Sequence, residues 1–230
     1  MEKTTIPLSR TVCERVTEAL REDIVDGVLA PEERLKISML TERYGVSAAP
    51  VREALQQLHT EGLISIIPNR GACVRRISAK EFVHLMDVRE AIEGLQARRC
   101  AETSTQTLIH ELKKANDKFE SAAQKVRSKQ SSVYNAEFHD LIAKHGGNWI
   151  ADEIITRVRW ITAALRRQYR SSSDRLKKAC LEHRQIIEAI EKQDPEGAEN
   201  AARLHVIATK ADILQMLPRE YLEPSHMQVH

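Results

Sequence analysis

The sequence of 230 residues is poor in aromatic side chains, which make up only 4% of the chain although 42% of all residues are hydrophobic. Few aromatics, together with frequent alanine, leucine, glutamate and arginine, favour helices over strands. Charged residues make up 30% of the chain. Such a chain can bury a hydrophobic core and does not belong to the disordered class. Internal repeats and low-complexity tracts are also absent.

Paired cysteines and long apolar runs are missing as well. The cysteines lie far apart and form no C-x-x-C pair: Cys13, Cys73, Cys100 and Cys180. This spacing argues against a disulfide framework or a zinc ribbon and favours a reducing cytosol. Met1–Arg10 lacks the apolar segment of a secretory signal, and no apolar run is long enough to cross a bilayer. We therefore expect a cytoplasmic protein without a membrane partner.

The formal net charge of +2 is too small to indicate nucleic-acid binding by itself, but the charge is uneven. Between residues 34 and 76 there are only three acidic residues, Glu42, Glu53 and Glu61. The basic residues of the same segment are Arg34, Lys36, Arg43, Arg52, Arg70, Arg75 and Arg76. A local basic surface of this kind is what binding to phosphate groups requires.

The first 77 residues have the order of a winged helix-turn-helix. Apolar residues at helical spacing predict helices over residues 9–26, 38–44 and 48–60. Gly45 allows a tight turn between the second and third helices, and Ser47 is a good N-cap for the third. After Gly62, a β-rich run over 63–67, turn residues over 68–71 and a second short strand over 72–74 predict a hairpin.

The remaining chain is predicted to be helical throughout. Ser78 is a suitable N-cap for a second domain, and Asp194 followed by Pro195 is a typical helix start. The expected helices cover residues 79–101, 106–125, 131–144, 149–169, 173–192 and 195–217. The fold class is therefore mainly α, with a winged helix-turn-helix over 1–77, an all-helical bundle over 78–218 and a tail over 219–230.

A helix-turn-helix reads DNA because its second helix enters the major groove with its N-terminal end first. The motifs that carry this pattern are Arg34-Leu35, Tyr44-Gly45-Val46-Ser47, Pro50-Val51-Arg52-Glu53-Ala54-Leu55, Glu61-Gly62-Leu63 and Asn69-Arg70-Gly71-Ala72. In this order they resemble the GntR family of transcription regulators. The segment Val88-Arg89-Glu90-Ala91-Ile92-Glu93 resembles the opening of the FCD effector domain of the FadR subfamily.

The resemblance implies which residues contact operator DNA. They are Arg34, Ser47, Ala48, Ala49, Arg52, Asn69, Arg70 and Gly71. The family motif V-S-R-T-P-V-R-E-A-L is altered here, because Ala48 and Ala49 replace its first arginine and its threonine. An arginine can add about 1–3 kcal/mol of base discrimination, which alanine cannot. We therefore expect an unusual half-site that depends more on Arg52 and the wing. The alternative for Arg52 is a surface arginine paired with a nearby acid.

Three histidines occupy predicted core-facing positions on three helices: His139, His183 and His205. A buried polar group is costly without a partner, and any one of these histidines alone would be read as a hydrogen-bonded core residue. Three together can share one divalent metal ion. Asn135 lies four residues before His139, so both side chains point to one place. Imidazole ligands suit zinc or nickel, and an added oxygen donor broadens the choice toward manganese.

The resemblance implies the same metal site, with an Asp-x-x-x-His pair and two later histidines as ligands. Asn135 replaces that aspartate, so we expect weaker metal binding, with the metal absent under some conditions. We also expect a small organic acid to complete the coordination. Arg89 belongs to an arginine-bearing motif of the family and is expected to hold the effector's carboxylate. An ion pair between Arg89 and Glu93 one turn later is the alternative.

The sequence thus predicts a homodimer that reads a palindromic operator, because one recognition helix reads only a few base pairs. An effector that binds one arrangement of the dimer better than another then changes operator affinity. The resemblance makes repression the default, with activation left open. Two rivals are a sensor for which the metal ion itself is the signal and a metal-dependent hydrolase. No acid near the three histidines is recognisable as a general base for the hydrolase.

Overall fold

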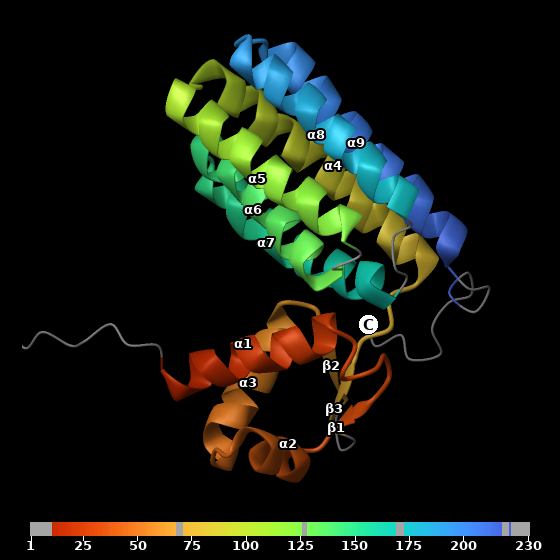
Figure 1. The fold of residues 1–230 in the computed structure, drawn as a ribbon. Coiled ribbons are helices and arrows are strands. Elements are labelled where there is room, and N and C mark those ends of the chain that lie inside the picture. Colours follow the sequence, from red (N-terminus) through yellow and green to blue (C-terminus); the bar gives the residue numbers. More distant parts are fainter. Residues whose placement is uncertain (1–10, 68–70, 126–127, 169–172, 218–220, 222–230) are drawn as a thin grey trace, which may run out of the picture. The chain divides into compact units, whose positions relative to one another are not determined.

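The computed structural model describes residues 11–67, 71–125, 128–168, 173–217 and 221. The chain forms two compact units, of which the first ends at Arg76 and the second begins at Ile77 (Figure 1). Sequence patterns place this division after residue 77. Among the described residues, none of the helices is both long and apolar enough to cross a bilayer.

The first unit consists of three helices and a small antiparallel sheet. The helices are α1 (Val12–Val25), α2 (Ile37–Tyr44) and α3 (Ala48–Thr60), and the strands are β1 (Arg34–Leu35), β2 (Ile64–Ile67) and β3 (Gly71–Val74). The strands lie in the order β1-β3-β2, with Ile64 opposite Val74 and Leu35 opposite Ala72. Helix α1 packs against α3, and the apolar faces of all three helices are buried in one core.

Two local features of this unit differ from the sequence-based expectation. Helix α1 begins at Val12, not near Ser9, because Thr11 and Glu14 form a reciprocal capping box with distances of 2.7 and 3.1 Å. Strand β1 was not predicted at all. It has two residues, too few for any periodicity, and it forms only because its backbone pairs with β3.

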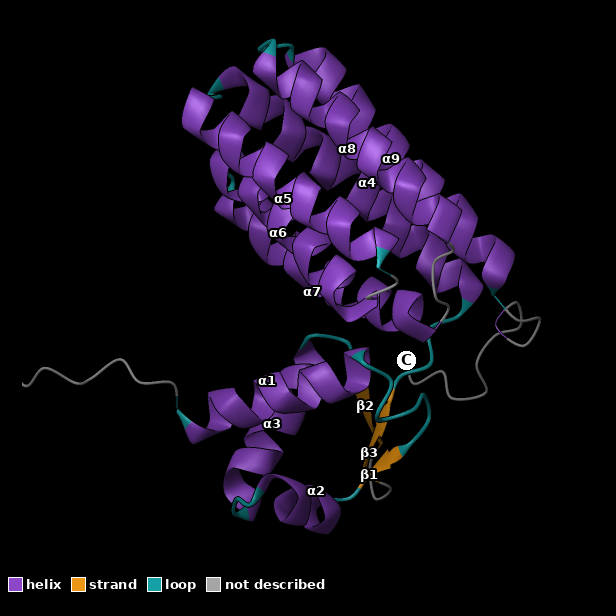
Figure 2. Cartoon of the chain, viewed as in Figure 1, coloured by secondary structure: helices purple, strands orange, loops and turns teal. Residues whose placement is uncertain are grey.

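The described part of the second unit consists of six helices joined by short connections (Figure 2). They are α4 (Ala79–Glu102), α5 (Gln106–Gln124), α6 (Ser128–Gly146), α7 (Trp149–Gln168), α8 (Ser173–Glu191) and α9 (Pro195–Met216). All six expected helices are present, although α6 begins earlier than residue 131. The Ser78 hydroxyl accepts from the N–H of Glu81, and Asp194 accepts from that of Gly197, so both predicted N-caps are confirmed.

Helix α4 lies at the centre of the bundle. It packs against α6, α7, α8 and α9, while α5 packs against α6 and α8. Large apolar side chains such as Phe82, Leu112 and Phe138 are fully buried there. The interior also holds polar side chains from several helices: Arg89, Glu93, Asn116, Asn135, His139, His183 and His205. Burying polar groups costs free energy unless they are paired. A cluster of them inside an otherwise apolar bundle therefore indicates a binding site.

Candidate functional site

The turn between α2 and α3 fixes the direction of the predicted recognition helix. Gly45 ends α2 with φ 64° and ψ 36°, a left-handed conformation that favours glycine. The backbone N–H groups of Gly45 and Val46 both donate to the carbonyl of Thr41. The tight turn expected at Gly45 is therefore present, and it places the start of α3 a few residues after the end of α2.

Helix α3 has one buried and one exposed face. Val51, Ala54 and Leu58 are fully buried, whereas Ala49 and Arg52 are exposed. The Arg52 side chain makes no hydrogen bond or ion pair within the part of the chain that the structure describes. The alternative in which Arg52 is paired with a nearby acid therefore finds no support here. Its guanidinium group is open to an external partner.

The N-terminal end of α3 differs from the expectation for Ser47. This residue occupies the N-cap position in extended backbone, but its side chain forms no capping hydrogen bond. Ala48 and Ala49 contribute no polar group in the first turn. The first N–H groups of α3 therefore lack a side-chain cap, and such a helix end favours an anion such as a DNA phosphate.

The other predicted DNA contacts lie on the small sheet. Arg34 is exposed in β1, and Gly71 is the exposed first residue of β3, opposite Ile67. Asn69 and Arg70 lie outside the described residues. Four of the predicted contacts thus lie at the start of α3: Ser47, Ala48, Ala49 and Arg52. Two more, Arg34 and Gly71, lie on the small sheet.

The second candidate site is the group of buried histidines inside the bundle. His139 comes from α6, His183 from α8 and His205 from α9, and each is almost completely buried. One ring nitrogen from each lies within 4.8 Å of the others. Asn135 is also buried, one turn before His139 on α6. The structure therefore brings together the three histidines that the sequence places in one metal site, and Asn135 is buried on the same helix as His139.

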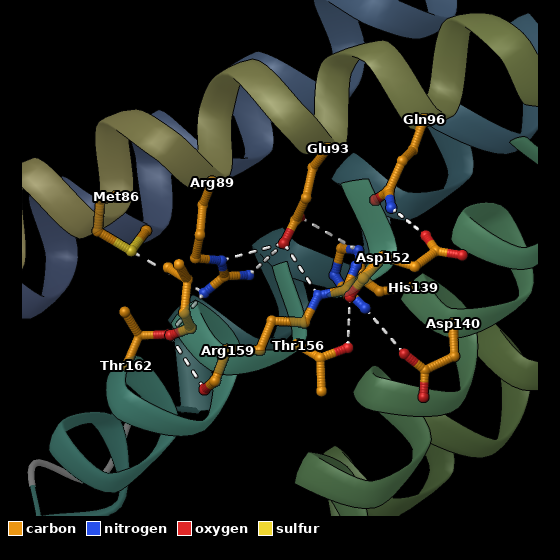
Figure 3. Close-up of polar contacts among 11 residues, drawn as sticks. Met86, Arg89, Glu93, Gln96, His139, Asp140, Asp152, Thr156, Arg159 and Thr162 are labelled. Carbon is orange, nitrogen blue, oxygen red and sulfur yellow. Dashed lines mark hydrogen bonds and ion pairs between the residues drawn. The ribbon is translucent and has the colours of Figure 1, made fainter. Parts of the chain in front are cut away.

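Each histidine has an oxygen atom near its Nδ1 atom, and for His183 and His205 this oxygen is within hydrogen-bond distance. Nδ1 of His183 lies 3.0 Å from Oδ1 of Asn116, and Nδ1 of His205 lies 2.7 Å from Oε2 of Glu182. Nδ1 of His139 lies 3.4 Å from Oε2 of Glu93 (Figure 3). An Nδ1–H group facing an acceptor leaves Nε2 as the unprotonated ring nitrogen, which is the usual arrangement behind metal-binding histidines.

The surroundings favour a neutral His139 ring and ionised side chains of Glu93 and Glu182. Burial lowers the pKa of His139 well below its ordinary value, so its ring is neutral at pH 7. Burial would raise the pKa of Glu182, but hydrogen bonds from His205 and Arg175 outweigh it and lower the pKa to about 2. Burial likewise opposes ionisation of Glu93, yet neighbouring cations, Arg89 foremost, hold its pKa well below the ordinary range.

Two acids that sequence patterns do not connect with the histidines lie next to them in the structure. Glu93 contacts His139, and Glu182 contacts His205. Asn135 supplies no negative charge, but the carboxylates of Glu93 and Glu182 lie next to the Nδ1 atoms of two of the histidines. A cation bound among the histidines would lie close to two anions of the protein itself.

Arg89 is part of the same network. It is buried and donates to Oε1 of Glu93 through Nε at 3.0 Å and Nη2 at 2.8 Å. Its Nη1 atom lies 3.3 Å from the hydroxyl oxygen of Thr162 on α7. The ion pair with Glu93 that the sequence offers as the alternative is therefore present. Glu93, the partner of Arg89, also contacts His139. Arg89 is therefore linked to the histidines through Glu93.

Sequence reasoning did not place Glu93, Asn116, Arg159 or Glu182 at the histidine site, although it offered Glu93 as an ion-pair partner of Arg89. Asn116 left a signal, because it interrupts the apolar stripe formed by Leu112 and Phe119 on α5, as His183 does on α8. Arg159 and Glu182 left no signal, because each lies only partly buried on a face whose neighbours come from other helices. Phe138 also fixes the site, since its ring stacks on His183 at 4.1 Å.

Comparison with known proteins identifies the family of each of the two domains. Residues 13–74 match the family "Bacterial regulatory proteins, gntR family", and residues 84–208 match the FCD domain. The chain is 26% identical over 208 residues to the HTH-type transcriptional repressor RspR of Escherichia coli K12, covering 90% of this chain and 91% of that protein. It is 30% identical over 221 residues to a probable D-xylose utilization operon transcriptional repressor of Paenarthrobacter nicotinovorans, covering 90% and 92%.

A solved structure extends the comparison to the fold. That of E. coli McbR/YncC matches with a TM-score of 0.79 at 20% identity, covering 90% of this chain and 99% of that one. The families and relatives are regulators of transcription, which removes the metal-dependent hydrolase from consideration. This chain belongs to the GntR family of bacterial transcription regulators, with an N-terminal DNA-binding domain and a C-terminal FCD domain.

Proposed function

We propose that this regulator is a homodimeric repressor whose operator affinity is controlled by a divalent transition metal and a small organic acid in the helical bundle. The observation that carries the proposal is the arrangement of three buried histidines, each with Nδ1 facing an oxygen of another residue. Zinc, nickel and manganese are the candidate ions, with His139, His183 and His205 as ligands and Asn135 as an oxygen donor.

The chemistry of the residues supports a metal site. Nε2 of His139 is buried and has no hydrogen-bond partner within the described chain. A buried nitrogen in that state is costly unless something else binds it. The ring nitrogens already lie within 4.8 Å of one another. Metal–nitrogen bonds of about 2.1 Å would require only a small contraction of this group.

An organic acid is the class of effector that the surroundings favour. When bound, the ion supplies a positive charge that a carboxylate oxygen can satisfy. Arg89 lies beside the site and is a strong carboxylate donor. An effector can change DNA affinity only if it binds one arrangement of the two DNA-binding domains better than another. A homodimer provides those two domains and matches a palindromic operator.

A metal ion acting alone is the second candidate signal. Glu93 and Glu182 lie behind two of the histidines as carboxylates. They can balance the charge of the ion without any organic anion. In this case the ion would change operator affinity by itself.

The test starts from metal content and operator binding of the full chain. His139→Ala combined with His183→Ala should remove bound zinc, nickel or manganese, as measured by elemental analysis after incubation with each metal. The matched control combines His84→Ala with His110→Ala, because both of these histidines are exposed. Equal metal content in the site variant and in the wild type would contradict the site.

Operator binding then separates the two signals. The operator is first selected from random duplex DNA by the wild-type protein. Its affinity is measured with no addition, with metal alone, and with metal plus a panel of small carboxylates. A change with metal alone supports the ion as the signal. A change that needs a carboxylate supports the organic acid, and no change in any condition contradicts ligand control.

A further inference from the structure

Two guanidinium groups from different helices converge on one oxygen of Glu93 (Figure 3). Arg89 of α4 donates to Oε1 through Nε at 3.0 Å and through Nη2 at 2.8 Å. Arg159 of α7 donates to the same Oε1 through Nε at 3.3 Å. The two arginines thus form a receptor for one carboxylate group, which Glu93 fills.

Glu93 satisfies this receptor incompletely. All three donors use Oε1, whereas Oε2 is buried and accepts no hydrogen bond within the described chain, its nearest polar neighbour there being Nδ1 of His139 at 3.4 Å. Arginine binds carboxylates most strongly when both oxygens are used in parallel. Glu93 is held four residues from Arg89 on the same helix, which restricts how it can turn. A free carboxylate has no such restriction.

The charges leave room for a second anion. Arg89 and Arg159 carry two positive charges, and Glu93 supplies one buried negative charge. Asp140 also accepts from Arg159, at 2.8 Å, but its side chain is 69% exposed. Water and salt therefore weaken that pair. The interior of the bundle keeps a positive charge that a small anion can neutralise.

Arg159 is the more accessible member of the pair. Its side chain is 18% exposed, compared with 8% for Arg89. Helix α7 packs mainly against α4 and makes a smaller contact with α6. An anion that enters from solvent therefore meets Arg159 first, on a helix with few neighbours.

We propose that Arg159 is a second effector-binding residue, which together with Arg89 binds the carboxylate of a small organic acid by displacing Glu93. The inference rests on the proposed function, in which the effector is an organic acid. It adds that the acid competes with a carboxylate of the protein and that α7 is the helix that responds. Glu93 also lies 3.4 Å from Nδ1 of His139, so its displacement would couple the arginines to the histidine centre.

Acetate is the probe for the test, because it is the smallest group that reproduces the end of the Glu93 side chain. Acetamide has the same shape without the charge and serves as the control ligand. Binding is measured on the zinc-incubated full chain by calorimetry and by the fluorescence of Trp160, which directly follows Arg159. Ionic strength is held constant so that general screening does not change.

Glu93→Gln keeps the side-chain shape and removes the competing charge. We expect it to bind acetate about tenfold more tightly than wild type, because arginine–carboxylate pairs are strong and a neutral amide competes for the two arginines less well than a carboxylate does. Adding Arg159→Gln should remove this gain, whereas adding Arg157→Gln, an exposed arginine on the same helix, should not. Acetamide should bind none of these proteins.

Three results would overturn the inference: no acetate binding by any variant, equal binding by wild type and Glu93→Gln, or a gain that survives Arg159→Gln. If Glu93→Gln does not fold, as judged by circular dichroism, Arg159→Gln alone decides, since it should weaken acetate binding to the otherwise wild-type chain.

A failure of the proposed function looks different. In one such outcome, the chain takes up no metal and yet binds acetate in a way that depends on Arg159. This result would contradict the metal site but would still support Arg159 as a carboxylate-binding residue. Metal uptake and a carboxylate response without the Glu93→Gln gain would overturn the inference alone.

Discussion

In the DNA-binding unit, four predicted contacts follow one another along the start of α3, and Arg52 among them is exposed and has no partner in the described chain. In the helical unit, the histidine centre takes residues from α4, α5, α6, α8 and α9, and these residues are buried or half-buried and paired. The DNA-contact site is an exposed surface of α3. The second site is part of the core itself.

This difference separates the consequences of mutation. Removing an exposed side chain such as Arg52 takes away a contact with DNA and leaves the packing of α3 unchanged. Removing a member of the buried network leaves its partner unsatisfied, and an unsatisfied buried group costs about 1–3 kcal/mol. In the helical unit, ligand binding and stability should therefore change together, whereas in the DNA-binding unit they should not.

The largest expected effect is that of Arg52→Ala. Loss of a bidentate base contact costs about 1–3 kcal/mol, so operator affinity should fall by as much as roughly 100-fold. Thermal stability should stay within about 0.5 kcal/mol of wild type, because the side chain is exposed. Fluorescence anisotropy with selected operator DNA measures the first quantity, and a melting curve measures the second.

Arg15→Ala is the control for Arg52→Ala, because Arg15 is an exposed arginine on α1, outside the predicted recognition helix. It should weaken binding to all DNA slightly and equally. Equal losses of specific binding in the two variants would place the recognition surface somewhere else on this domain.

Asn116→Leu is the corresponding change in the buried centre and should have the next largest effect. It removes the oxygen that faces Nδ1 of His183, at 3.0 Å, while keeping the number and branching of the side-chain heavy atoms. Loss of such an orienting partner typically reduces metal affinity about 10- to 100-fold. Competition with a coloured zinc chelator measures this affinity.

Asn116→Asp is the matched control, because it keeps an oxygen at the same place and should retain the zinc affinity. Asn116→Leu should also lower the melting temperature of the helical unit. Wild-type zinc affinity in Asn116→Leu would mean that Asn116 does not orient His183 for a metal.

The comparison also explains what the sequence could predict. The helices of both units follow from periodic apolar positions, and the turn at Gly45 follows from one glycine in a short motif. The three histidines were recognisable because each lies at a predicted core-facing position of its own helix, in or beside a run of apolar or small residues. All of these signals are local, so one segment of sequence is enough to detect them.

The rest of the centre depends on contacts between distant segments. Glu182 meets His205 from a neighbouring helix, and Glu93 meets Arg159 across 66 residues of chain. Neither acid interrupts a pattern in its own segment, so nothing marks it as part of the site. Strand β1 was missed for the same reason, since only its pairing with β3 makes it a strand.

Ala48→Arg tests the departure from the family's motif and should have a smaller effect than Arg52→Ala. The new guanidinium group at the start of α3 would contact a base that alanine cannot recognise by hydrogen bonding. We expect a new preference of about tenfold for guanine at one half-site position. Selection from random DNA measures it, with Ala48→Gln as an uncharged control. An unchanged selected sequence would show that position 48 does not face the bases.

The smallest expected effect is a pH dependence that belongs to the helical unit alone. Glu182 has a pKa of about 2 in the folded chain, below its ordinary 4.5, because His205 and Arg175 bond to its ionised form. A lowered folded pKa means that the ionised carboxylate stabilises the fold above pH 4.5 and that this contribution is lost as the pH falls toward 2. Between pH 6 and pH 4, the loss should be about 0.5–1 kcal/mol.

Glu182→Gln isolates this contribution, because glutamine keeps the shape but does not ionise. The difference in unfolding free energy between wild type and Glu182→Gln should be larger at pH 6 than at pH 4 by that same amount. Urea unfolding followed by tryptophan fluorescence measures it selectively, since Trp149 and Trp160 are the only tryptophans of the chain and both lie in α7. If this difference in unfolding free energy stays constant from pH 6 to pH 4, folding does not lower the pKa of Glu182. Glu182 would then support the histidine centre by packing, and not by its negative charge.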